Sequence, residues 1–216
     1  MAACELFLGR LDGAHDESAL SDEERAKAER FRRPHEKNRY RSSRSFLRCL
    51  LGAKTNAAPH EVEIAVKCVS CGSDEHGKPY LPSFPDLSFN LSHSENRVAV
   101  VVAEGHQVGV DIEAVPDQVM PALWQMLASQ RERTSVREIP DWDEQIALWV
   151  RKEALLKATG QGLAVDPRNV DVDAQGCYPS SGDLYGHVWV EDVQVGGDYR
   201  CSVAMVGSRP VISRLT

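Results

Sequence analysis

Apolar and polar residues alternate strictly along residues 108–113, and this period of two predicts a β-strand. Val108, Val110 and Ile112 share one face of the strand, while Asp111 and Glu113 share the other. Two carboxylates therefore stand side by side on one strand face. They belong either to a functional site or to an ordinary half-buried edge strand whose polar face meets water.

The residues before this strand predict two more strands, and with them a local antiparallel meander. Residues 88–94 read as a strand that ends in small hydroxyl residues around His93, and the apolar run 98–103 is followed by a turn. Further strands are predicted at residues 5–8, 62–69, 187–193 and 199–206. The last two would form a hairpin, since a Gly-Gly turn lies between them.

Two helices are predicted in the first quarter of the chain. Ser21, with Glu24 three residues later, has the pattern of a capping box and begins a helix that Pro34 interrupts. A second helical stretch covers residues 36–51, and we expect Gly52 to end it.

The clearest helical pattern is at residues 141–159, where Gly160 supplies the stop signal. The preceding segment, residues 115–140, has an irregular helical tendency. Its apolar residues, including Met120, Trp124 and other large side chains, predict an exposed apolar patch on a connector.

Each half of the chain thus offers a helix followed by antiparallel strands, which predicts an α+β fold. We divide the chain into an N-terminal subdomain, residues 1–113, and a C-terminal subdomain, residues 114–216. Each is expected to be a small antiparallel sheet packed against a long helix.

Composition and charge narrow the class of protein. The 216 residues are enough for one large or two small domains, and the net charge of −7 argues against a nucleic-acid-binding protein. Residues 21–48 nevertheless carry ten Lys or Arg against five Asp or Glu, which indicates either a phosphate-sized anion site or a solvated helix face. The chain start lacks a signal-peptide pattern and no run has the length of a membrane span, so we expect a cytoplasmic protein without a membrane partner.

Cysteine spacing gives a weaker signal. Six cysteines are scattered along the chain, and only Cys68 and Cys71 form a Cys-x-x-Cys pair. A closed zinc site needs four ligands, and the sequence has no second pair of this kind. We therefore expect free thiols here, in preference to a zinc site or a disulfide.

The candidate chemistry is concentrated in a few polar residues. Glu153 and Lys157 lie four residues apart on one helix face, as a surface ion pair or as two groups that point into one cleft. His93, between Ser92 and Ser94, could donate hydrogen bonds to an anion. Paired carboxylates such as those of the central strand offer hard oxygen ligands, which suit Mg²⁺ or Mn²⁺.

Three stretches together resemble the signature motifs of the 4′-phosphopantetheinyl transferases, of the larger monomeric type that activates peptide and polyketide synthases. They are residues 90–94 (Asn-Leu-Ser-His-Ser), 108–113 (Val-Gly-Val-Asp-Ile-Glu) and 149–157 (Trp-Val-Arg-Lys-Glu-Ala-Leu-Leu-Lys). Residues 77–79 (Gly-Lys-Pro) and the arginine-rich stretch 30–48 are also similar to the family's pattern. The resemblance implies a monomer of two α+β subdomains related by a pseudo-twofold axis, with coenzyme A in the cleft between them.

The resemblance also implies roles for individual residues. Asp111, Glu113 and Glu153 match the acids of the Mg²⁺ site, where Mn²⁺ would also fit. The residues that match coenzyme A contacts are Arg39, Lys78, Pro79, Ser92, His93 and Lys157. Arg39 matches the arginine that meets the 3′-phosphate, with Arg48 as the rival for that role. The catalytic residues implied are Glu153 as the base, Lys157 as the group that stabilises the leaving group, and His93.

The implied reaction is transfer of 4′-phosphopantetheine from coenzyme A to a serine of an apo acyl or peptidyl carrier protein, with release of 3′,5′-ADP. The same residue types suit two other functions. One is an Mg²⁺-dependent hydrolase of a phosphoester or nucleotide, which would use water as the acceptor. The other is a non-enzymatic module that binds carrier proteins through the apolar patch around Trp124.

Overall fold

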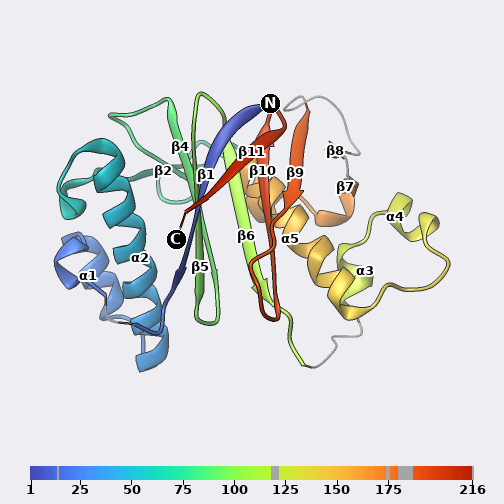
Figure 1. Ribbon diagram of the computed structural model, residues 1–216, viewed down its shortest axis with the longest axis horizontal. Coiled ribbons are helices and arrows are strands. Elements are labelled where there is room, and N and C mark those ends of the chain that lie inside the picture. Colours follow the sequence, from blue (N-terminus) through green and yellow to red (C-terminus); the bar gives the residue numbers. More distant parts are fainter. Residues whose placement is uncertain (14, 118–121, 174–175, 180–186, 216) are drawn as a thin grey trace.

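The computed structural model describes residues 1–13, 15–117, 122–173, 176–179 and 187–215, and Figure 1 shows how its elements are arranged. The strands are β1 (Ala2–Arg10), β2 (Ala65–Lys67), β3 (Lys78–Tyr80), β4 (Leu87–Ser94), β5 (Arg97–Glu104), β6 (Val108–Ala114), β7 (Val170–Asp173), β8 (Gly176–Pro179), β9 (Val188–Asp192), β10 (Tyr199–Val206) and β11 (Pro210–Leu215). The helices are α1 (Asp22–Ala28), α2 (Pro34–Thr55), α3 (Leu123–Leu127), α4 (Gln130–Ser135) and α5 (Trp142–Thr159). None of the helices within these ranges is both long and apolar enough to cross a membrane.

The strands form two larger sheets and one small hairpin. The four-stranded sheet has the order β11-β1-β5-β4, the five-stranded sheet has the order β6-β10-β9-β8-β7, and β2 pairs with β3. The inner faces of the larger sheets share one core, built from alternate residues of β1, β5, β6 and β10. Its buried members are Cys4, Leu6, Ala99, Val101, Ala103, Val108, Val110, Ile112, Cys201, Val203 and Met205. The alternation predicted for residues 108–113 is therefore confirmed.

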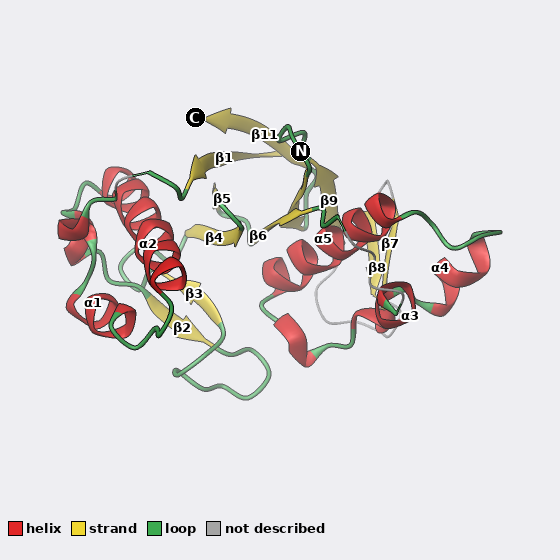
Figure 2. Ribbon diagram, turned by 90° about the horizontal axis from the view of Figure 1, so that it is seen from below, coloured by secondary structure: helices red, strands yellow, loops and turns green. Residues whose placement is uncertain are grey.

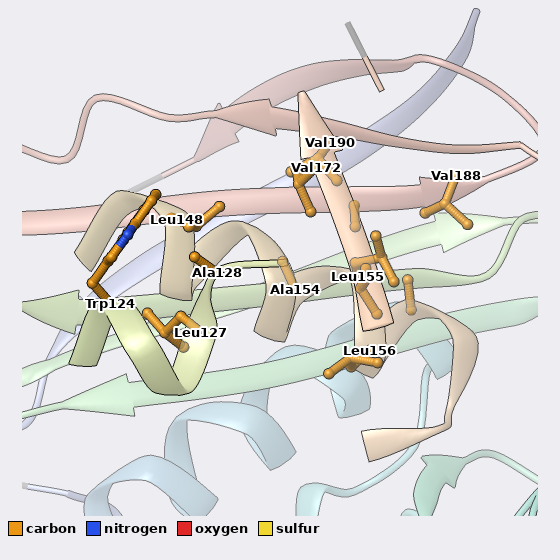
Figure 3. Close-up of a cluster of buried hydrophobic side chains, with 13 residues drawn as sticks. Trp124, Leu127, Ala128, Leu148, Ala154, Leu155, Leu156, Val172, Val188 and Val190 are labelled. Atoms are coloured by element: carbon orange, nitrogen blue, oxygen red, sulfur yellow. The ribbon is translucent and has the colours of Figure 1, made fainter. Parts of the chain in front are cut away.

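Each larger sheet carries one long helix on its outer face, and Figure 2 shows α2 and α5 over the two halves of the strand layer. Leu47 and Leu51 of α2 pack against Phe89 and the outward-facing valines of β5. Helix α5 packs over the second sheet, with Leu155 and Leu156 in the cluster of Figure 3. The predicted α+β class is confirmed. The first sheet is mixed, however, because β11 returns parallel to β1.

A buried lysine joins α5 to the shorter helices. Lys152 is 0% exposed, and its ammonium group donates to the carbonyl oxygens of Leu127 at 2.8 Å and Pro167 at 2.9 Å. It also forms an ion pair of 2.7 Å with Glu132 of α4. A buried charge needs such a complete set of partners. Lys152 therefore fastens the middle of α5 to α3, to α4 and to the turn before β7.

The two larger sheets also meet edge to edge, where β4 and β6 lie side by side without pairing through their backbones. Side chains of β4 accept from the backbone N–H groups of β6 instead: Ser88 Oγ from Val108 at 3.3 Å, Asn90 Oδ1 from Val110 at 3.1 Å and Ser94 Oγ from Ala114 at 3.1 Å. Three N–H groups on the open edge of β6 are satisfied in this way. We call this row of contacts the β4–β6 seam. The predicted three-strand meander is wrong in its last step, because β6 pairs with β10.

The structure corrects two predictions about helices. The capping box of Ser21 is confirmed, but Pro34 occupies the first turn of α2 instead of interrupting a helix. Helix α2 also continues past Gly52 and ends at Asn56, which has a left-handed conformation with φ of 55°. Gly52 is needed for a different reason, since a Cβ there would lie 2.8 Å from the carbonyl oxygen of Ala57.

The connector differs from its prediction as well. Its helical tendency is confirmed by α3 and α4, but Trp124 is only 7% exposed and belongs to the core beneath α5. The expected exposure of Trp124 itself is therefore wrong, while Met126 on the same helix is 58% exposed. Met120 lies outside the described residues. The predicted strand at residues 62–69 is reduced to the three residues of β2.

Strand pairing crosses the predicted boundary at residue 113 in both directions. Strand β6 belongs to the sheet of the C-terminal half, and β11 belongs to the sheet of the N-terminal half. The division into residues 1–113 and 114–216 stays a prediction about folding units.

Helix α5 approaches β6 unusually closely at Gly109. A Cβ on this residue would lie 2.1 Å from the carbonyl oxygen of Ala154 and 2.4 Å from the backbone nitrogen of Ala158. Both of these atoms belong to the backbone of α5, so no side chain can rotate away. The glycine therefore allows Glu153 and Lys157 of α5 to come close to Asp111 of β6.

We expect Gly109→Ala to lower the free energy of unfolding by about 1–3 kcal/mol, because the added methyl group forces the helix away from the sheet. Urea unfolding followed by circular dichroism measures this change. Gly13→Ala is the matched control, since a Cβ at Gly13 would meet no atom within 4 Å. Equal losses for the two variants would contradict the close approach of α5.

Candidate active site

A polar pocket of about 280 Å³ lies where β4, β6 and α5 meet. It brings together six of the predicted site residues: Ser92, His93, Asp111, Glu113, Glu153 and Lys157. Leu91 and Trp149 complete its lining. The pocket therefore joins all three of the motifs that carried the resemblance, and it lies between the first sheet and the second.

Asp111 is the most buried acid of the pocket, at 2% exposure. Its Oδ1 accepts from the Lys157 ammonium group at 2.6 Å and from the Ser92 hydroxyl at 2.7 Å. Its Oδ2 is buried and, among the described residues, has no hydrogen-bond partner. The alternative of a polar strand face that simply meets water is therefore wrong for Asp111.

Glu113 and Glu153 have pKa values above the usual range. For Glu113 the main cause is burial, to which the charges of Asp111 and Glu153 add, while a 2.6 Å hydrogen bond from the Ser94 hydroxyl opposes it. Burial and the charge of Asp111 raise the pKa of Glu153, and Lys157 opposes that rise. Three carboxylates thus share one pocket with a single ammonium group within hydrogen-bonding distance of Asp111. Such an excess of negative charge favours a bound cation.

The pKa of His93 is shifted downward, whereas those of Glu113 and Glu153 are shifted upward. Partial desolvation in the pocket wall and the positive charges of Arg39 and Lys157 lower its pKa. The neutral imidazole is therefore favoured near pH 7. Arg39 is near enough to influence His93, but it lines a neighbouring hollow of about 450 Å³ together with residues of α2, such as His35.

The structure gives two other predicted residues different surroundings. Lys78 Nζ donates to the carbonyl oxygens of Val108 at 3.0 Å and Ala158 at 2.8 Å, and burial lowers the pKa of Lys78 to about 7. Pro79 lies in the short strand β3 and not in a loop. Neither residue lines the polar pocket.

Arg48, the rival of Arg39, is 5% exposed and is fully engaged inside the protein. Its guanidinium group pairs with Glu24 and donates to the carbonyl oxygens of Pro59 at 2.9 Å and Val62 at 3.0 Å. These contacts fasten α2 to α1 and to the segment before β2. Arg48 thus has its donors directed at the protein itself.

A larger apolar groove of about 740 Å³ adjoins the polar pocket and shares Glu113 and Trp149 with it. Its other lining residues come from the connector, α5 and the turn at residues 166–168: Ala114, Pro116, Ala122, Leu123, Gln125, Met126, Leu127, Trp142, Ile146, Asp166, Pro167 and Arg168. Part of the apolar surface of the connector, including the exposed Met126, therefore lines this groove, and Trp149 lies at its boundary with the polar pocket.

Sequence reasoning did not identify the residues of β4 that hold β6 and its acids in place. Ser94 was noted only beside His93, yet its hydroxyl group binds both Glu113 and the backbone of Ala114. Asn90 and Ser88 were not assigned any role, although they hold β6 in place. The period of two in residues 88–94 was the available signal, because it puts Ser88, Asn90, Ser92 and Ser94 on one strand face.

The donor set of the pocket fits a hard divalent cation. Asp111 Oδ2 is a buried carboxylate oxygen without a partner, and two further carboxylates line the same pocket. Oxygen-rich sites of this kind suit Mg²⁺ and also Mn²⁺. The neighbouring ammonium group and imidazole can bind a phosphate group. Together these groups can bind a metal-complexed phosphoester and accept a proton from a hydroxyl group.

Comparison with known proteins agrees with the motifs. The sequence profile of the 4′-phosphopantetheinyl transferase superfamily matches residues 107–204. The 4′-phosphopantetheinyl transferase HetI of Nostoc sp. is 34% identical over 154 residues, which cover 68% of this chain and 62% of HetI. The 4′-phosphopantetheinyl transferase Sfp of Bacillus subtilis is 26% identical over 154 residues, which cover 68% of this chain and 63% of Sfp.

A third relative matches a shorter part of this chain. The 4′-phosphopantetheinyl transferase AcpT of Escherichia coli is 36% identical over 94 residues, or 40% of this chain and 46% of AcpT. The chain thus spans about three fifths of the length of HetI and Sfp. The profile match includes β6 and α5, which carry the three acids and Lys157. Residues 107–204 thus match the 4′-phosphopantetheinyl transferase superfamily, the family whose signature motifs the three stretches resemble.

Proposed function

We propose that this protein transfers the 4′-phosphopantetheine group of coenzyme A to a serine of an apo acyl or peptidyl carrier protein and releases 3′,5′-ADP. The observation that carries the proposal is the polar pocket, in which Asp111, Glu113 and Glu153 lie with Lys157 and His93. These are the residue types that a metal-assisted transfer of a phosphoryl group requires.

Asp111, Glu113 and Glu153 are the residues that would hold Mg²⁺. The unpartnered Oδ2 of Asp111 and the crowding of three acids support this assignment. A bound Mg²⁺ supplies charge neutralisation at the pyrophosphate of coenzyme A. The orientation of Asp111 and Glu113 comes from the hydroxyl groups of Ser92 and Ser94, which donate to them.

Glu153 is the base we propose for the serine hydroxyl group. Its raised pKa makes its carboxylate more basic than an exposed one. The serine proton passes to Glu153 as the serine oxygen bonds to phosphorus and the bond from phosphorus to 3′,5′-ADP breaks. The Lys157 ammonium group and His93 stabilise the departing phosphate.

Coenzyme A would lie across the seam between the two sheets, with the pyrophosphate in the polar pocket. This position agrees with the proposed pseudo-twofold relation of the subdomains, because the pocket is lined by β4 on one side and by β6 and α5 on the other. Arg39 is the arginine we propose for the 3′-phosphate, since Arg48 is engaged inside the protein. Lys78 and Pro79 stay proposed as residues near the nucleotide.

The carrier protein is proposed to dock on the apolar groove beside the pocket. The groove shares Glu113 and Trp149 with the pocket, so a partner seated there would have its serine close to Glu153. Met126 offers 58% of its surface for such a contact. We further propose that the enzyme acts as a cytoplasmic monomer in secondary metabolism.

The first test is incubation of the protein with coenzyme A, Mg²⁺ and an apo carrier protein, followed by mass spectrometry of the carrier. We expect the carrier to gain one phosphopantetheine group, and Asp111→Asn to reduce the rate by a factor on the order of 10²–10³. Asparagine keeps the volume of Asp111 and can still accept from Ser92. Glu104→Gln, at an exposed acid on β5, serves as the control.

Two outcomes would contradict the proposed function. Release of 3′,5′-ADP without labelling of the carrier would assign a hydrolase, and a stable complex without either product would assign a binding module. An Asp111→Asn variant with the parent rate would contradict the metal site alone.

A second prediction concerns Glu153. The Glu153→Gln substitution should lower kcat by a factor of order 10²–10⁴ and change coenzyme A binding far less, because a base acts in the transition state. Steady-state kinetics and calorimetric titration with coenzyme A separate the two effects. Glu144→Gln, at an exposed position of the same helix, should keep the parent kcat. If Glu153→Gln labels the carrier at the parent rate, Glu153 is neither the base nor an essential metal ligand.

A third prediction distinguishes the arginines of α2. Arg39→Ala should weaken coenzyme A binding by about 1.5–3 kcal/mol and abolish the preference for coenzyme A over 3′-dephospho-coenzyme A. Arg33→Ala, at a side chain that is 72% exposed, should leave that preference intact. Retention of the preference by Arg39→Ala would show that another cation meets the 3′-phosphate.

A further inference from the structure

The connection between β2 and β3 brings two thiols and an imidazole together at a distance from the polar pocket. One ligand atom each of Cys68, Cys71 and His76 lie within 4.8 Å of one another, and Cys71 Sγ is 3.5 Å from His76 Nε2. In a tetrahedral zinc site, a thiolate sulfur and an imidazole nitrogen are separated by roughly 3.6 Å. The observed separation is therefore the one that two ligands of a single zinc ion have.

Backbone hydrogen bonds hold Cys68 in a tight turn. The N–H of Gly72 donates to the Cys68 carbonyl oxygen at 2.9 Å, and the N–H of Cys68 donates to the Ser73 carbonyl oxygen at 2.9 Å. These two hydrogen bonds close a turn that places Cys68 and Cys71 near each other.

We propose that Cys68, Cys71 and His76 bind one Zn²⁺ ion, which clamps the two ends of the β2–β3 connection together. Two thiolates and an imidazole favour zinc over the hard cations that suit the acid-rich pocket. Zinc takes four ligands in such sites, and the described residues supply three, so water completes the set. The third ligand, His76, is what the cysteine spacing did not reveal.

The position of the three residues explains what the metal would do. Cys68 directly follows β2, and His76 precedes β3 by two residues, so the ion would join both ends of the connection. Strands of three residues form only a marginal hairpin. Gly77, with φ of 121°, already lets the chain return beside Lys67, where a Cβ would lie 2.2 Å from the carbonyl oxygen. The metal would close this connection further.

The clamp lies next to the helix that carries Glu153 and Lys157. Val69 of the connection is 3.5 Å from the Cβ position at Gly160, which ends α5. Lys78, the first residue of β3, donates to Ala158 of α5 and to Val108 of β6. A fixed hairpin therefore holds Lys78 against the junction of α5 and β6. The zinc site is a structural support and takes no part in the proposed transfer.

The test is the metal content of the full chain, purified with a thiol reductant and dialysed against a weak chelator. We expect one zinc ion per chain by native mass spectrometry for the parent and for Cys49→Ser, whose cysteine is exposed and lies outside the cluster. Cys71→Ser, also at an exposed thiol, should contain none. Titration of the zinc-free parent with Co²⁺ should produce the thiolate-to-cobalt absorption band, and Cys71→Ser should lack it.

Thermal unfolding supplies a readout that does not depend on catalysis. A strong chelator should lower the Tm of the parent and of Cys49→Ser, and leave the Tm of Cys71→Ser unchanged. Parent protein that shows neither bound zinc nor the cobalt band would overturn the proposal. So would zinc that Cys71→Ser and Cys49→Ser retain equally, or a Cys68–Cys71 disulfide in protein that takes up no zinc after reduction. None of these results depends on whether phosphopantetheine is transferred.

Discussion

The β4–β6 seam is the constraint on which the rest of the site depends. Two sheet edges meet there, and side chains of β4 replace the backbone ladder that would otherwise join them. Because alternate residues of a strand share one face, the strand that satisfies the N–H groups of β6 also presents Ser92 and Ser94 to the acids of β6. One row of small polar residues thus joins the sheets and orients Asp111 and Glu113. A backbone ladder at this place would have left no room for a polar pocket.

Helix α5 forms the other wall of the polar pocket. Its short distance from β6 determines which charged side chains of the pocket lie close together. Gly109 lets the helix backbone reach the strand, and Lys157 can then pair with the buried Asp111. The ion pair compensates only one of three acids, while burial raises the pKa of Glu113 and Glu153. The pocket therefore retains more acid than its own cation can balance. A site of this kind is unfavourable for the isolated fold and is suited to a bound metal ion and a phosphorylated substrate.

Periodicity in the sequence was sufficient for the local elements that bury one face. It predicted the strand at residues 108–113 and the helix at residues 141–159, together with the common face of Glu153 and Lys157. It could not predict the partner of β6, because alternation determines which side chains are buried and not which strand lies alongside. The burial of Trp124 was missed for a related reason: a large apolar residue on an irregular segment gives no sign of the cluster that covers it. Gly52 was predicted to end the helix. The sequence does not reveal its close contact with Ala57, which is the reason for a glycine at this position.

The two groups of candidate metal ligands show the same limit of prediction from sequence. The three acids of the pocket could be grouped from sequence because the motifs that carry them resemble those of a known family, and the structure brings them together. The cysteine pair was judged by a spacing rule that asks for a second pair, whereas the third candidate ligand atom comes from a histidine five residues beyond Cys71. Hard oxygen donors lie at the junction of the sheets, and soft sulfur donors lie on the hairpin that supports it. Since ligand softness decides which metal binds, two metal sites of the proposed kinds would select different ions from the same solution.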